Sequence, residues 1–283
     1  MDPGGQRRHA PHLRRGRREG LQDLSAVPEG ARLSGFAALV LAGSRPGAVD
    51  AVAAYGEATH KALIRLQGRT LLARVAVALR DAGAGRIAVV SSHPDVRREA
   101  EVLGLEVLDE QAGPSLSVKA AGAHLGTPLL VTTADHALLD GEWIRRFLDD
   151  TPSDADVAAL VAARATVERA APDTRRTWLK LADGHWSGCN LFYLANARAL
   201  AVVDLWRRVE AERKRPWRMA GILGVGMLAS YALGWLTLKA AAERLGRLAG
   251  VTAAIVETPY GLASVDVDKP ADLDLVRKIV GDA

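Results

Sequence analysis

The residues Phe36-Ala-Ala-Leu-Val-Leu-Ala-Gly-Ser-Arg-Pro-Gly47 decide the fold of this chain. An unbroken apolar run from Phe36 to Ala42 leads into a glycine, and the polar residues Ser44 and Arg45 follow. Such a run predicts a β-strand that is buried on both faces and ends in a glycine turn. In parallel α/β sheets, ligands bind outside the carboxyl ends of the strands, so this turn is the first candidate for a binding loop.

Short apolar runs and helical segments alternate downstream of this strand. The runs predict further strands at 86–91, 105–108, 128–133 and 157–161. Segments 69–82, 94–103, 118–125 and 141–148 have the residue pattern of helices. This alternation predicts an α/β fold with a mostly parallel sheet, helices on both faces and right-handed crossovers.

The pattern changes after residue 160. A hairpin, three helical segments, two strands and a closing helix are predicted there, in that order, at 177–194, 196–215, 221–238, 239–248, 251–256, 263–267 and 270–280. We interpret the three helical segments as an insertion of about 196–249 within a single domain of residues 35–283.

The composition excludes several classes of protein. The chain has 283 residues, of which 49% are hydrophobic and 25% charged, as in ordinary globular domains. Its one cysteine, Cys189, rules out a disulfide within the chain, argues against a cysteine-based zinc site and fits a reducing cytoplasm. Aromatic residues make up only 5%, so the base-stacking surfaces of nucleic-acid-binding proteins are not expected.

Residues 1–34 hold seven arginines and four acidic residues, and they supply most of the net charge of +4. Because the remaining sequence is nearly neutral, no nucleic-acid partner is expected. The segment lacks the apolar core of a secretory signal. We interpret it as a disordered basic leader. The alternatives are that translation starts further downstream than the printed sequence does, or that the segment is a basic arm for anionic partners.

Polar residues follow three of the predicted strands. In the loop after Ala42, glycines let the backbone approach phosphate oxygens, and the guanidinium of Arg45 can bind these oxygens through parallel hydrogen bonds. A second cation, Lys61, follows further along the chain. Asp135 comes directly after a buried strand, which is typical of a Mg²⁺ ligand in phosphate chemistry. Each group also has a structural explanation, namely a glycine turn with solvated cations and an aspartate that caps a helix.

The third group is Asp266-Val-Asp268-Lys-Pro270. In an extended segment, both aspartates project from the same face. Asp268 lies close to the expected N-cap of the closing helix. We therefore expect Asp266 to bind a metal ion and Asp268 to cap the helix or to support the metal ligand.

The order of these groups resembles the MobA-like NTP transferase family, which includes molybdenum-cofactor, sugar-phosphate and alcohol-phosphate nucleotidyltransferases. The resemblance covers roughly residues 35–195 and 250–281. It rests on Leu41-Ala-Gly-Ser-Arg-Pro-Gly, His60-Lys-Ala-Leu, Gly68-Arg-Thr-Leu-Leu, Gly113-Pro-Ser, Ala134-Asp-His and Asp266-Val-Asp-Lys-Pro-Ala-Asp-Leu. It implies a Rossmann-like three-layer α/β/α fold of the nucleotide-diphospho-sugar transferase type, to which the helical insertion is added.

The resemblance also implies roles for matching residues. Arg45, Lys61 and Asp135 would carry catalysis, while Asp135 and Asp266 would hold a Mg²⁺ cofactor. The residues implied to bind the nucleotide are Leu41, Ala42, Gly43, Ser44, Arg45, Lys61, Gly113, Ser115 and Ser117.

Other features concern the acceptor and departures from the family. Lys180 and Asn190, on the predicted hairpin, are the candidates for acceptor binding. Ser44 replaces the second glycine that the family loop often has, so close backbone approach to phosphate is less assured. Residues 48–59 make the segment between Arg45 and Lys61 longer than in the family. We interpret them either as a lid or as an adaptation to a different acceptor.

The function implied is that of a cytoplasmic nucleotidyltransferase. It would transfer an NMP unit from an NTP to a phosphorylated small molecule, a sugar or alcohol phosphate, and release pyrophosphate. Ser115-Leu-Ser117-Val118 looks like the Ser-Val element of cytidylyltransferases, which favours CTP over GTP. A molybdenum-cofactor cytidylyl- or guanylyltransferase and a non-catalytic nucleotide-binding protein on the same fold are the alternatives.

Residues 214–238 place a basic cluster before a mainly apolar stretch whose length is at the lower limit for a membrane span. A span would interrupt a catalytic domain, so we expect a buried or dimer-forming helical insertion, and with the latter a homodimer. Peripheral contact of residues 213–238 with an anionic membrane, and hence membrane association, is the alternative.

Overall fold

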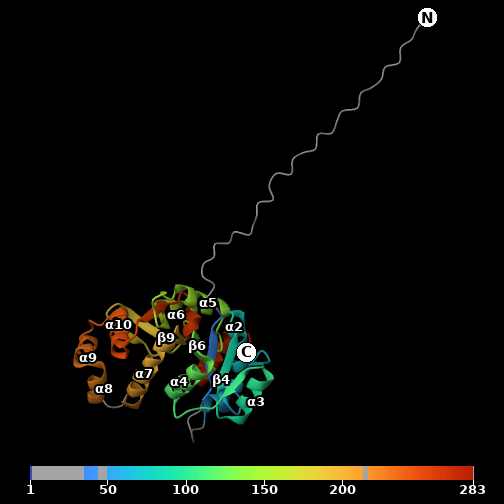
Figure 1. Cartoon of the computed structure of the whole chain (residues 1–283). Coiled ribbons are helices and arrows are strands. Elements are labelled where there is room, and N and C mark those ends of the chain that lie inside the picture. The colour runs from blue at the N-terminus through green and yellow to red at the C-terminus, as the bar shows by residue number, and fades with distance from the viewer. Residues whose placement is uncertain (2–34, 44–49, 213–215, 283) are drawn as a thin grey trace. The chain divides into compact units, whose positions relative to one another are not determined.

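The computed structural model describes Met1 and residues 35–43, 50–212 and 216–282. The residues from Gly35 onward form one compact unit, which carries every element named below (Figure 1). The expectations for residues 2–34, for Ser44 and for Arg45 lie outside the described residues.

The predicted α/β fold is confirmed, because a sheet of mostly parallel strands lies between two layers of helices. The strand order is β10-β7-β9-β6-β1-β4-β5, and β8 pairs with β9 beside this path. The strands are β1 (Ala37–Leu41), β4 (Arg86–Val90), β5 (Glu106–Leu108), β6 (Leu129–Thr133), β7 (Val157–Ala163), β8 (Leu179–Leu181), β9 (Gly184–Leu194) and β10 (Ala253–Glu257). The hairpin β8–β9 was predicted, but the position of β9, antiparallel between β6 and β7, was not.

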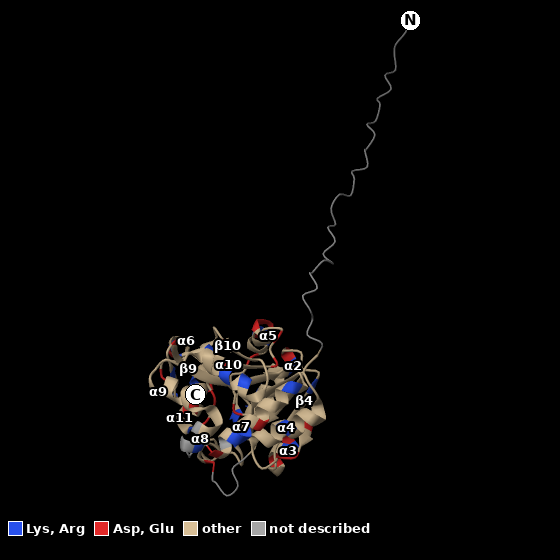
Figure 2. Ribbon diagram, turned by 60° about the vertical axis from the view of Figure 1, so that its left-hand side comes forward, with Lys and Arg blue, Asp and Glu red and all other residues tan. Residues whose placement is uncertain are grey.

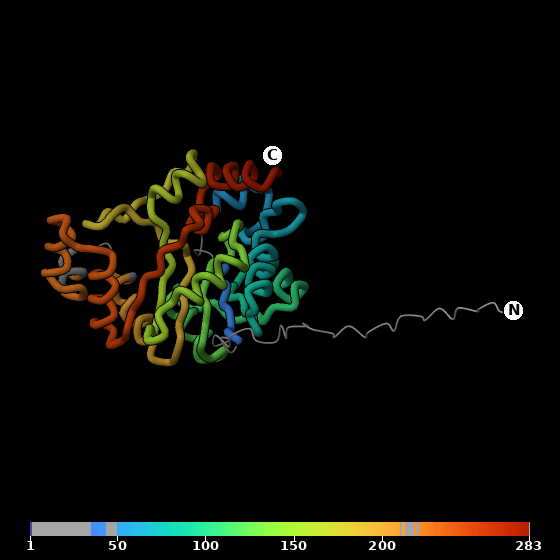
Figure 3. The backbone as a smooth tube through the Cα atoms, turned by 90° about the horizontal axis from the view of Figure 1, so that it is seen from above, coloured from blue at the N-terminus to red at the C-terminus, as the bar shows by residue number. Residues whose placement is uncertain are grey.

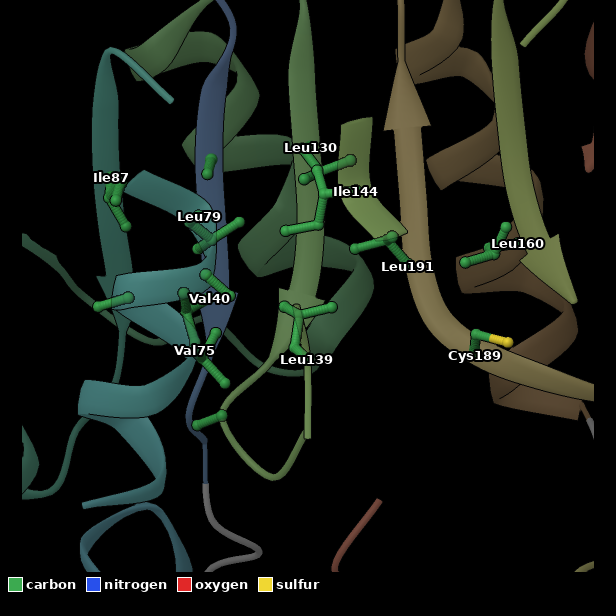
Figure 4. Close-up of a cluster of buried hydrophobic side chains, with 14 of the residues drawn as sticks. Val40, Val75, Leu79, Ile87, Leu130, Leu139, Ile144, Leu160, Cys189 and Leu191 are labelled. Carbon is green, nitrogen blue, oxygen red and sulfur yellow. The ribbon is translucent and has the colours of Figure 1, made fainter. Parts of the chain in front are cut away.

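Strand β1 shows why its apolar run decides the fold. It pairs in parallel with β4 on one side and β6 on the other. Its side chains alternate between the two faces of the sheet. Val40 lies in the core drawn in Figure 4, whereas Leu39 lies in the core on the opposite face. Both faces exclude water, so a polar side chain at either position would lose its hydrogen bonds to water and destabilise the fold.

Helices cover both faces of the sheet. The face of Val40 is covered by α2 (Leu71–Asp81), α3 (Pro94–Val102) and α5 (Gly141–Asp150). The face of Leu39 is covered by α4 (Pro114–Leu125) and α7 (Leu200–Glu212). The other α-helices are α1 (Ala51–Tyr55), α6 (Arg164–Ala170), α8 (Pro216–Leu223), α9 (Val225–Ala232), α10 (Leu238–Ala249) and α11 (Pro270–Val280). Basic and acidic residues are interspersed over these helices in Figure 2.

The apolar stretch 221–238 is divided between helices. Helix α8 ends at Leu223 and α9 begins at Val225, because Gly224 between them has a φ of +88° that breaks the helix. Both helices lie on the side of the unit away from α11 (Figure 3). None of the helices in the described part of the chain is long and apolar enough to cross a bilayer.

The predicted strand at 263–267 was wrong. The chain forms a 3₁₀ helix at Gly261–Ser264, followed by extended residues that join no sheet. The backbone N–H of Val267 donates instead to the carbonyl of Asp135 at 3.1 Å. A single bond to the loop after β6 thus replaces the ladder of bonds that a strand would make.

Gly261 is required by the close packing of this 3₁₀ helix. A Cβ at this position would collide with the backbone carbonyl of Thr166, which cannot move aside as a side chain can. We expect Gly261→Ala to lower the free energy of unfolding by about 1–3 kcal/mol in urea titrations. Gly85→Ala is the matched control, since no atom of the described residues obstructs a Cβ there, and it should change stability by less than about 0.5 kcal/mol. Equal stability of the two variants would contradict this packing argument.

Cys189 should be unreactive in the folded protein. Its side chain lies in the core of Figure 4, and burial raises the pKa of its thiol from the ordinary 9.0 to about 12. At mildly alkaline pH the reactive thiolate is therefore scarce and shielded from reagents. We expect Ellman's reagent to react at least ~100-fold more slowly with the native protein than with the protein in denaturing guanidinium chloride. Similar rates in the two solutions would show that the thiol is accessible.

Candidate active site

Lys61 is presented by a short turn. The turn is the 3₁₀ helix Lys61–Leu63, capped by His60, whose ring accepts the backbone N–H of Ala62 at 3.0 Å. Burial lowers the pKa of His60, which keeps the ring neutral and able to accept this bond. Residues 43–60 are rich in Gly, Ala, Ser and Pro, which predicts a loop. The structure forms helix α1 within this segment, and the prediction missed it because five residues show almost no periodicity.

Asp135 follows β6 directly and is buried. One of its carboxylate oxygens, Oδ2, forms an ion pair with Nζ of Lys61. The other, Oδ1, is buried and has no hydrogen-bond partner among the described residues. Asp135 does not cap a helix, because α5 begins at Gly141 and is capped by Asp140. A buried carboxylate oxygen without a donor is poorly stabilised by the protein and suited to a cation.

Asp266 and Asp268 alternate with two buried valines. Val265 and Val267 belong to a hydrophobic cluster that also contains residues of α11. The extended chain therefore turns both aspartates to the other side, although it is not a strand. Oδ1 of Asp268 lies 3.3 Å from Nζ of Lys61.

Of the two roles expected of Asp268, the capping of the closing helix was wrong. Helix α11 begins at Pro270 and its N-cap is Lys269. The backbone N–H groups of Asp268 and Lys269 donate to the carboxylate of Asp272, at 3.2 and 2.8 Å. The carboxylate of Asp272 thus accepts the hydrogen bonds of the free N–H groups at the start of the helix. The carboxylate of Asp268 is not used for capping and can pair with Lys61.

Charges compete within this cluster. Burial would lower the pKa of Lys61, but the Asp135 carboxylate, and then Asp268, raise it above its ordinary value. Lys61 is therefore a cation at any physiological pH. Burial raises the pKa of Asp266, and the nearby Asp268 and Asp135 add to this effect, while the Arg176 guanidinium opposes it.

Asp266 is held by two side chains from other parts of the chain. Asn190 donates to its Oδ2 at 2.6 Å, and Arg176 forms an ion pair with its Oδ1 at 2.7 Å. Asn190 has a φ of +48°, and it lies where the register between β7 and β9 shifts at a bulge. Left-handed backbone at a residue other than glycine persists where the surroundings hold it, and it is concentrated at functional sites. The bulge aims the amide of Asn190, a predicted acceptor ligand, at a candidate metal ligand.

A divalent cation fits these residues. Oδ1 of Asp135 lacks a partner within residues 35–43, 50–212 and 216–282, and the carboxylates of Asp266 and Asp268 face the same cluster of charges. The described residues hold no group of three or more His, Cys, Asp or Glu side chains arranged to bind a metal. Mg²⁺ does not need one, because proteins commonly bind it through one or two carboxylates while water and substrate phosphates complete its coordination.

Leu41, Ala42 and Gly43 lie at the carboxyl end of β1. A Cβ at Gly43 would collide with the carboxylate of Glu110. That carboxylate accepts a hydrogen bond of 2.7 Å from Oγ of Ser92. The absence of a side chain on Gly43 thus lets an acidic residue lie against the end of β1.

Gly113, Ser115 and Ser117 form the start of α4. The helix begins at Pro114, earlier than predicted, because proline suits the first helical position. Gly113, with a φ of +140°, leads into it. Both serines are buried, and Oγ of Ser117 accepts the backbone N–H of Gln111 at 3.0 Å. Ser117 therefore fixes the loop between β5 and α4.

The structure forms two pairs from the predicted residues, Lys61 with Asp135 and Asn190 with Asp266, and the carboxylates of Asp135 and Asp266 are near enough to influence each other electrostatically. Lys180 is not part of either pair. This residue lies on β8, opposite His185 of β9, and its exposed side chain forms no ion pair with any described residue.

Two charged residues at the site were missed from the sequence. Arg176 belongs to an Arg-Arg pair that precedes the predicted hairpin, and Glu110 follows β5 closely. The rule that ligands bind beyond the carboxyl ends of strands could have singled out Glu110. For Arg176 the only signal was a pair of arginines beside a hairpin considered for acceptor binding.

Comparisons with known proteins agree with this architecture. Residues 38–217 match the MobA-like NTP transferase domain. A hypothetical transferase from Thermus thermophilus has a similar structure, with a TM-score of 0.72 and 32% sequence identity, over 84% of this chain and 99% of its own. A search of curated proteins found no match.

Two more distant structures share the fold. CMP:2-keto-3-deoxy-manno-octonic acid synthetase complexed with CTP is 14% identical, with a TM-score of 0.53 over 88% of this chain and 99% of its own. CTP:phosphocholine cytidylyltransferase from Streptococcus pneumoniae is 12% identical, with a TM-score of 0.53 over 86% of this chain and 98% of its own.

Proposed function

The chain belongs to the MobA-like NTP transferase family, a family of nucleotidyltransferases, and from this premise we propose that it transfers CMP from CTP to a sugar or alcohol phosphate with Mg²⁺ as its cofactor. The observation that carries the proposal is the ion pair between Lys61 and Asp135. The second oxygen of this aspartate is buried and has no partner in the described part of the chain. Nucleotidyl transfer needs a cation at the reacting phosphate and a carboxylate for a metal ion, and these two residues offer both.

In the proposed reaction, an oxygen of the acceptor phosphate forms a bond to the α-phosphorus of CTP. The bond from that phosphorus to the bridging oxygen breaks, and pyrophosphate leaves with the electron pair. No protein group has to remove a proton, because a phosphate monoester is largely ionised near neutral pH.

The residues of the site have separate tasks in this scheme. The ammonium of Lys61 neutralises charge that develops on the α-phosphate. Asp135 and Asp266 would hold Mg²⁺, which when bound neutralises the triphosphate and orients it. Asn190 fixes the carboxylate of Asp266, and supporting contacts of this kind commonly change metal affinity by about 10–100-fold when removed.

Two observations support CTP as the donor. The buried residues Ser115 and Ser117 occupy the first turn of α4, where the resemblance to cytidylyltransferases lies. Among proteins of the same fold, one has a structure in complex with CTP and another is named as a CTP:phosphocholine cytidylyltransferase. GTP is the next candidate.

The test is pyrophosphate release with Mg²⁺, in which each of the four NTPs is combined with a panel of sugar phosphates, alcohol phosphates and molybdopterin. The proposal expects release with CTP and a sugar or alcohol phosphate. Release only with molybdopterin would replace it by the molybdenum-cofactor function, and NTP binding without any release would favour a non-catalytic nucleotide-binding protein.

A further inference from the structure

Arg176 is a largely buried cation at the site, and the reaction proposed above gives it no contact with a substrate. It lies in the segment between α6 and β8, and its side chain is 14% exposed. Its guanidinium forms the ion pair of 2.7 Å with Oδ1 of Asp266, while Nε donates to Oγ of Ser187 on β9 at 3.0 Å. A guanidinium has five N–H donors, so further donors are left for an anion.

The position of Arg176 is close to the reacting groups. Its partner Asp266 is two residues from Asp268, and Oδ1 of Asp268 lies 3.3 Å from Nζ of Lys61. The ion pair of Arg176 with Asp266 therefore places the guanidinium beside the same short segment that contacts Lys61. Arg176 thus stands between the candidate metal ligand Asp266 and the β8–β9 hairpin.

The charges at the site indicate that Arg176 needs a second anion once a metal ion binds to Asp266. Lys61 and Arg176 face the three carboxylates of Asp135, Asp266 and Asp268. If Asp266 binds a metal ion, its negative charge is shared with that ion and its attraction for Arg176 weakens. A largely buried guanidinium then requires another anion, since an unpaired buried charge is costly. The proposed reaction brings two anions to the site. The triphosphate of CTP is neutralised by Mg²⁺ and Lys61 in the scheme above, whereas the phosphate of the acceptor is assigned no cation there.

We propose that Arg176 binds the phosphate group of the acceptor, and that its ion pair with Asp266 closes this subsite until the metal and nucleotide bind. The inference rests on the proposed function and extends it. It predicts an order of binding in which the CTP–Mg²⁺ complex comes first and the acceptor second. Planar guanidinium groups suit this task, because they bind phosphate through two parallel hydrogen bonds.

Inorganic phosphate is the probe, and the full chain is titrated with it by calorimetry, with and without Mg²⁺ and the unreactive α,β-methylene analogue of CTP. The wild-type protein should bind phosphate in the presence of the analogue and about 10-fold more weakly or not at all without it. Arg176→Gln should weaken phosphate binding about 10–100-fold while it leaves binding of the analogue unchanged. Arg175→Gln is the matched control, because this exposed neighbour forms no ion pair with the rest of the described chain, and it should bind phosphate as the wild type does.

Other outcomes would overturn the inference. Unchanged phosphate binding by Arg176→Gln would remove Arg176 from the acceptor subsite. Loss of analogue binding in that variant would show that Arg176 only supports Asp266. If the wild type bound the analogue but no phosphate, this inference alone would fail, whereas failure to bind the analogue would also contradict the proposed function. In transfer assays, the inference further expects a raised KM for the acceptor and an unchanged KM for CTP in Arg176→Gln.

Discussion

Asp135→Asn is expected to lower kcat for nucleotidyl transfer by about 10³-fold or more. The substitution keeps the size of the side chain but removes the charge that would hold Mg²⁺, and a metal ion contributes several kcal/mol to the stabilisation of charge in a transition state. Each 1.36 kcal/mol corresponds to a factor of about ten in rate. The neutral amide would also replace the ion pair with Lys61 by a weaker contact. The ammonium of Lys61 would then be held less firmly in position for the α-phosphate. Initial rates of pyrophosphate release at saturating substrates measure the effect.

Asp109→Asn is the matched control for this variant. Asp109 is exposed and pairs with Arg97 at 2.9 Å, whereas the carboxylates that pair with Lys61 are those of Asp135 and Asp268. Exposed ion pairs contribute about 1 kcal/mol or less, so this variant should keep its rate and its thermal unfolding midpoint. If Asp135→Asn were folded and within a few-fold of the wild-type kcat, Asp135 would not be the metal ligand that we propose.

Lys61→Met is expected to lower kcat by about 10²–10³-fold, the usual effect of removing one group that stabilises transition-state charge. Methionine keeps the length of the side chain and loses the cation. The carboxylates of Asp135 and Asp268 would then lose the counter-charge that they share, and the α-phosphate would lose its neutralising contact. The loss should therefore fall on kcat more than on the KM for the acceptor.

Two further variants sharpen this prediction. Lys61→Arg keeps the charge and should recover part of the rate, although a planar guanidinium does not reproduce the ammonium. Lys119→Met removes an exposed lysine that pairs with Asp204, and it should behave as the wild type. A Lys61→Met protein with normal kcat would show that Lys61 stabilises the folded protein without taking part in the transfer.

The sheet and part of the site could be predicted because their signals are local. The run from Phe36 to Ala42 is buried on both sides of β1, as continuous apolar sequence requires. Lys61 and Asp135 were both predicted to lie beyond the carboxyl ends of strands, and they form an ion pair although 74 residues separate them.

The remaining features depend on contacts between distant segments. The antiparallel position of β9, the bulge at Asn190 and the pairing of Arg176 with Asp266 are set by tertiary packing, which local propensity does not encode. The apolar residues Val265 and Val267 predicted a strand, but a bond to the loop of Asp135 and burial beside α11 hold them outside the sheet. The two aspartates project from the same side of this segment, as predicted, but residues 263 and 264 belong to a 3₁₀ helix and the rest pairs with no strand.

The most direct test of the central claim follows the two ends of CTP in one reaction, with Mg²⁺ and the panel of phosphorylated acceptors. Our account predicts that a label on the α-phosphorus appears in the product joined to the acceptor, and that a label on the γ-phosphorus appears in an equal amount of pyrophosphate. Release of inorganic phosphate from the γ position without transfer of the α label would contradict it, because the protein would then be a nucleotide hydrolase.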